Sequence, residues 1–161
     1  MLEEGIPTWE GEGVKIYTNQ DIGVGRWDAL LTSFLNLTSP GVYIAINAYL
    51  PRNGKMIAAL SQLRAQIQKI TGAATTIGFG PRFLHSTGQL HKGGSANALF
   101  IQITADPQQD LEIPMQGRGI TFGKLQRAQA IGDYEALAAR GRKILRLHLS
   151  SPEEIQQLTN F

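Results

Sequence analysis

VYIAINAYLPRNGKMIAALSQLRAQIQKITGAATTIGF, residues 42–79, contains a complete strand–helix–strand pattern. Residues 42–50 are apolar apart from Asn47, which is typical of a strand covered on both faces, and Pro51 ends this strand. Asn53 is a suitable N-cap for a helix whose apolar residues recur every three or four positions up to Gly72. The apolar segment 75–79 then predicts a second strand.

The same alternation extends through the rest of the chain. Short strands are predicted at 14–17, 98–104 and 143–149, and helices at 26–37, from Thr121 to Arg140 with a break at Gly132-Asp133, and from Ser151 onward. We therefore expect an α/β fold with a mostly parallel sheet of about five strands and helices on both faces. Residues 1–12 predict a loose N-terminal arm, and residues 13–161 a single domain.

The amino-acid composition argues against several classes of function for this protein. The 161 residues are 42% hydrophobic and 17% charged, with a formal net charge of +2 and no cysteine. Scattered cations and a small net charge argue against nucleic acid as a partner, and the lack of cysteine excludes disulfides and thiolate metal sites. No apolar run approaches a membrane span, and the first residues lack the pattern of a signal peptide. We expect a cytoplasmic protein that does not bind membranes.

The candidate functional segment is residues 80–94, GPRFLHSTGQLHKGG, between two predicted strands. Loops at strand ends are where α/β proteins place ligands, and histidine can exchange protons with oxygen near neutral pH. His85 is the candidate acid or base, and Ser86, Thr87 and Gln89 offer groups suited to a polyhydroxylated ligand. A purely structural, hydrogen-bonded His85 is the alternative.

The remaining candidates are weaker. His91 and Lys92 are interpreted as loop anchors or partner contacts, because no third ligand of suitable spacing accompanies His91. We therefore predict no metal site. His148 lies on the polar phase of the last predicted strand and is interpreted as non-functional. Neither the Walker A pattern nor a Rossmann glycine fingerprint occurs, so no nucleotide cofactor is indicated.

Several segments carry a resemblance to a known family. They are, in order, AYLPR at 48–52, the approach to Gly80 from Thr71, the 80–94 segment itself, FGKLQRAQA at 122–130 with Gly132-Asp133, and LRLHL at 145–149. Residues 41–150 resemble the C-terminal part of phosphoglucose isomerases, specifically the isomerase portion of fused transaldolase/phosphoglucose isomerases. The 80–94 motif is the most specific of these segments.

The resemblance implies a three-layer sandwich of the sugar-isomerase (SIS) type and the interconversion of glucose 6-phosphate and fructose 6-phosphate without cofactor or metal. It gives His85 the role of opening the sugar ring, and it makes Ser86, Thr87 and Gln89 possible sugar contacts. In family dimers this histidine can reach the site from the neighbouring subunit. A homo-oligomer is therefore a possible assembly.

Parts of the family's machinery have no counterpart here. The base glutamate in a Glu-Ser-x-Gly-Lys-like motif, the second ring-opening lysine and the phosphate-binding Ser/Thr loop are not found in this sequence. We expect a C-terminal isomerase subdomain that is inactive alone and needs an upstream isomerase region or a second subunit. The alternative is a non-catalytic module that binds sugar phosphates or a protein partner.

Overall fold

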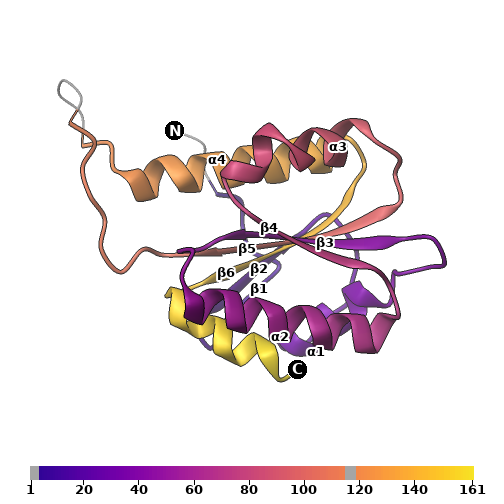
Figure 1. Ribbon diagram of the computed structural model, residues 1–161. Helices are drawn as coiled ribbons and strands as arrows, with labels where there is room; N and C mark the ends of the chain where they lie inside the picture. The colour runs from indigo at the N-terminus through magenta and orange to yellow at the C-terminus, as the bar shows by residue number, and fades with distance from the viewer. Residues whose placement is uncertain (1–3, 115–118) are drawn as a thin grey trace.

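Six strands form one sheet in the order β1-β2-β6-β5-β3-β4 (Figure 1). The computed structural model describes residues 4–114 and 119–161. The strands are β1 (Trp9–Gly11), β2 (Val14–Thr18), β3 (Tyr43–Tyr49), β4 (Thr75–Phe79), β5 (Ala98–Ala105) and β6 (Lys143–Leu149).

Helices cover both faces of the sheet, as the sequence predicted. Figure 1 shows α1 (Trp27–Leu35), α2 (Gly54–Thr71) and the C-terminal 3₁₀ helix η2 (Pro152–Thr159) below it. The helices α3 (Thr87–Gly93) and α4 (Phe122–Ala139) lie above it, and the short 3₁₀ helix η1 (Arg82–His85) precedes α3. Within the described ranges, no helix combines the length and apolar character needed to cross a bilayer.

The fold is α/β, but the sheet is mixed rather than mostly parallel. The strands β3, β4, β5 and β6 run parallel to one another, whereas β2 pairs antiparallel with both β1 and β6. β1 lies inside the segment for which a loose arm was expected. Its partner β2 follows after the two-residue turn Glu12-Gly13, in which both residues have positive φ. Strands joined by so short a turn can pair only antiparallel, as a hairpin.

The larger core lies between the sheet and the α1/α2/η2 layer. Alternate residues of the central strands point into it, together with the apolar stripe of α2, which includes Met56, Leu60 and Leu63. Asn53 caps α2 by accepting a hydrogen bond from the Met56 amide, and Gly72 ends it in the left-handed conformation. Helical periodicity therefore predicted this element and its caps correctly.

The opposite face of the sheet, under α4, is polar across several strands. The row Asn47, Gln102, Arg146, Tyr17 runs through four neighbouring strands in register, and all four side chains are buried. The Gln102 amide donates a hydrogen bond to the Ala130 carbonyl of α4 at 3.0 Å. The helix α4 continues through Gly132-Asp133, so the predicted break is wrong.

Candidate functional site

The candidate site lies at the edge of the sheet where the four parallel strands end. After β3 the chain turns into α2 on one face, and after β5 it leads to α4 on the other. β3 and β5 are neighbours, so their outgoing connections diverge at this point. Such a topological switch point is where open α/β sheets place their ligands.

A cavity of about 670 Å³ occupies this switch point. Its volume is within the range of small-molecule sites. Residues that follow β3 and β5 line it, as does one side of α4; they include Tyr49, Asn53, Pro107, Asp110, Gln126 and Gln129. Asp110 holds the start of α4, because its carboxylate accepts hydrogen bonds from the Thr121 hydroxyl and the Gly123 amide. These hydrogen bonds lower the pKa of Asp110.

The loop predicted as the site begins at the same edge, after β4. His85 ends η1, and Thr87 and Gln89 lie in the first turn of α3. His85, Ser86, Thr87 and Gln89 are all exposed. They do not line the 670 Å³ cavity, which Pro81 reaches from the start of the loop. The predicted residues thus lie together on the surface, near the cavity but not in it.

The other half of the predicted segment anchors this loop. The His91 ring is buried between Phe83 and Phe100, with ring centroids 6.1 and 5.0 Å away, and burial lowers its pKa. Lys92 Nζ contacts Asp133 Oδ1 on α4 at 2.5 Å. The short helix α3 is therefore fixed to the body of the protein through His91 and Lys92, while Thr87 and Gln89 in its first turn are exposed beside His85.

Gly80 sets the entry to the loop, because the buried ring of Tyr49 leaves no space for a side chain there. A Cβ at this position would lie 2.6 Å from Tyr49 Cε1. We expect Gly80→Ala to lower the free energy of unfolding by about 1–3 kcal/mol through overpacking. Urea denaturation measures this change. Gly93→Ala is the matched control in the same loop, since a Cβ there would meet nothing within 4 Å. Equal stability of the two variants would contradict the expected clash.

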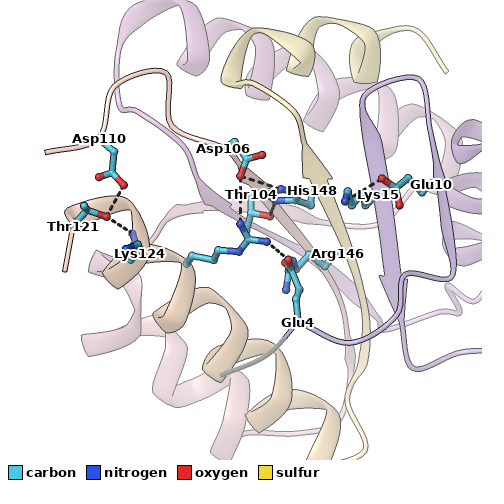
Figure 2. A network of polar contacts seen from close by, with 11 residues as sticks. Glu4, Glu10, Lys15, Thr104, Asp106, Asp110, Thr121, Lys124, Arg146 and His148 are labelled. Atoms are coloured by element: carbon cyan, nitrogen blue, oxygen red, sulfur yellow. Dashed lines mark hydrogen bonds and ion pairs between the residues drawn. The ribbon is translucent and has the colours of Figure 1, made fainter. Parts of the chain in front are cut away.

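His148, which its place on the polar phase of the strand led us to interpret as non-functional, lies in a buried polar cluster where β5 and β6 end. His148 is buried, its Nδ1 is 2.9 Å from the Thr104 hydroxyl, and its Nε2 is 3.4 Å from Asp106 Oδ1 (Figure 2). Thr104 and His148 are direct partners in the β5–β6 register. Strand alternation placed His148 on the polar face, but it could not show that α4 covers this face.

Burial keeps the His148 imidazole neutral by lowering its pKa from 6.5 to about 4. The unfolded chain therefore binds a proton between these pH values that the folded chain does not. Stability is greatest above pH 6.5 and falls as the pH drops toward 4, by up to ~3 kcal/mol for this group. Denaturant titrations at several pH values should show a flatter profile for His148→Gln than for the unsubstituted chain. Parallel profiles would show that the His148 pKa is not depressed.

The arrangement supports proton transfer at the surface and ligand binding in the cavity. The exposed His85 imidazole is free to approach a ligand, whereas the buried His148 reaches only a smaller cavity of about 110 Å³. No cluster of three or more histidine, aspartate or glutamate side chains able to hold a metal ion is found among residues 4–114 and 119–161.

Comparison with known proteins shows the fold alone. No protein-family model matches the chain, and no curated protein matches it. Among solved structures, the crystal structure of a hypothetical protein, TT0462 from Thermus thermophilus, aligns with a TM-score of 0.64 and 20% sequence identity. The alignment covers 83% of this chain and 38% of that protein. The chain therefore spans well under half the length of this structural neighbour.

Proposed function

We propose that the chain is the C-terminal, sugar-isomerase-type portion of a phosphoglucose isomerase. In this role the His85 imidazole protonates the ring oxygen of the bound sugar phosphate, and Ser86, Thr87 and Gln89 contact its hydroxyls. The observation that carries the proposal is the exposure of these four side chains on one loop at the carboxyl edge of the sheet. An exposed histidine on such a loop can exchange a proton with a ligand that a second protein surface also binds.

Further support comes from the apolar side chains beside the 670 Å³ cavity. Leu111, Phe122 and Leu125 line it and are exposed, with Leu111 69% accessible. Exposed apolar groups gathered around a cavity are typical of a surface that another protein segment covers. We propose that this segment is an upstream isomerase region or a second subunit that carries the glutamate base and the lysine.

Reconstitution tests the proposal. The chain is mixed with the glutamate- and lysine-bearing isomerase region of a fused transaldolase/phosphoglucose isomerase, and the conversion of fructose 6-phosphate to glucose 6-phosphate is measured. We expect a rate well above that of either part alone. If the mixture is no faster than the upstream region alone, the proposal is wrong.

The alternative is a module that binds sugar phosphate without chemistry, which the large cavity beside the loop favours. Calorimetric titration of the chain alone with fructose 6-phosphate distinguishes the two. Binding at millimolar ligand without a rate gain on reconstitution supports the module. A rate gain supports the isomerase.

A further inference from the structure

Two arginines meet on one carboxylate beside the end of the sheet. Glu4, in the segment before β1, forms ion pairs with Arg127 of α4 and Arg146 of β6. Figure 2 shows the Glu4 carboxylate pointing toward the Arg146 guanidinium. Arg146 is only 3% exposed, whereas Arg127 is about half exposed. Burying a guanidinium is costly without a partner, so the core of this protein depends on a negative charge at this position.

The Arg146 side chain is fixed in place and still has an unused donor. Its guanidinium lies over the Tyr17 ring, 4.5 Å from the ring centroid, an arrangement that orients the planar group. Its Nε is buried and has no hydrogen-bond partner in the described part of the chain. Burial also lowers the pKa of Arg146 to about 10, so the group remains charged at neutral pH. One carboxylate therefore leaves part of this donor set unsatisfied.

The segment that supplies Glu4 is weakly anchored. Its next apolar side chain, Ile6, is 96% exposed and so contributes no apolar anchoring. A cavity of about 220 Å³ adjoins the Glu4–Arg146 ion pair, and Tyr17, Tyr134 and the acidic Glu135 also line it. Arg127 contacts Glu4 from outside this cavity. Since a water molecule takes about 30 Å³ of liquid volume, this space can hold several water molecules beside the Glu4 carboxylate.

We propose that Arg127 and Arg146 form a binding site for a phosphate group, which the Glu4 carboxylate occupies as an internal competitor. A phosphate dianion neutralises two guanidiniums and presents more acceptor oxygens than a carboxylate does, and paired arginines bind it through bidentate hydrogen bonds. Asp106 also faces Arg127, at 3.4 Å, but its side chain is about half exposed, so water screens its charge. The site lies apart from the His85 loop and does not rest on the function proposed above.

Titration of the full chain with inorganic phosphate tests the site, followed by NMR of the arginine Nε–H resonances. Removing the competitor with Glu4→Gln should tighten phosphate binding by about tenfold, within the usual range of coupling between two sites. The Arg146 resonance should shift during the titration. Adding Arg127→Gln to this variant should reverse the gain. Glu112→Gln, which makes the same charge change at an exposed position, is the control and should bind as the unsubstituted chain does.

Two results would overturn the proposal. One is equal phosphate affinity of Glu4→Gln and Glu112→Gln. The other is a set of shifts at exposed cations without a change at Arg146, which means adventitious binding. If Glu4→Gln does not fold, Glu4→Asp retains the charge on a shorter side chain. Phosphate should then raise the melting temperature of Glu4→Asp more than that of the unsubstituted chain, and an equal rise would refute the internal competition.

Discussion

His85→Ala should lower the isomerisation rate of the reconstituted enzyme by about 10²–10⁴-fold, the usual contribution of one acid–base group. The reason is that ring opening requires a proton on the ring oxygen, and the proposed role gives this step to the His85 imidazole. The loss should appear in kcat, because the imidazole acts on the reacting atoms. Steady-state kinetics with fructose 6-phosphate measures it.

The controls for this variant rest on the exposed positions of His85 and of a second residue far from the loop. His85 is exposed and packs into no core cluster, so the alanine variant should keep the melting temperature and circular dichroism of the parent chain. Arg64→Ala, at an exposed position on α2 across the sheet, should leave the rate unchanged. An unchanged rate for His85→Ala would remove this histidine from the chemistry, even if reconstitution succeeds.

Lys92→Met should destabilise the fold by about 3–5 kcal/mol, because it leaves a buried carboxylate without its cation. The Asp133 side chain is 2% exposed, and its Oδ2 has no hydrogen-bond partner in the described ranges. Lys92 is therefore the main compensation for this charge. Urea denaturation at neutral pH gives the difference in the free energy of unfolding.

Two further variants separate the ion pair from a general effect of losing a lysine. Lys55→Met, at an exposed position in the first turn of α2, should change stability by less than about 0.5 kcal/mol. The double variant Lys92→Met/Asp133→Leu should recover most of the loss, because apolar pairs replace buried ion pairs at little cost. If Lys92→Met lowers the free energy of unfolding no more than Lys55→Met does, another group or water must stabilise the Asp133 side chain.

Local patterns predicted the elements that have a strong period or a clear cap. The apolar run before Pro51 became β3, and the stripe between Asn53 and Gly72 became α2 with both caps. β1 escaped prediction because three residues carry too little periodicity. The direction of β2 was missed because alternation shows which face a side chain occupies but not how a strand pairs.

The sequence indicated only some residues of the candidate site, and their roles stay predictions. Composition and loop position identified His85, which is exposed at the carboxyl edge of the sheet. His148, Asp133 and Arg146 were not identified, because polar residues are ordinarily expected to face water. Here α4 covers them, and only the packed structure shows it. The predicted helix break at Gly132-Asp133 is wrong for the same reason. Glycine followed by aspartate often ends a helix, but here α4 continues and Asp133 pairs with Lys92 of α3.

The polar row beneath α4 means that the two layers of helices are attached to the sheet by different combinations of forces. On the α1/α2/η2 side, the burial of apolar side chains holds the helices on the sheet, and ionic strength and mild acid hardly affect this contribution. On the α4 side, apolar contacts of Leu137 and Ala130 are joined by an ion pair and hydrogen bonds, which salt screens and protons disrupt. Solvent conditions therefore act on this protein asymmetrically. Added salt or acid should weaken the attachment of α4 more than that of α1, α2 and η2.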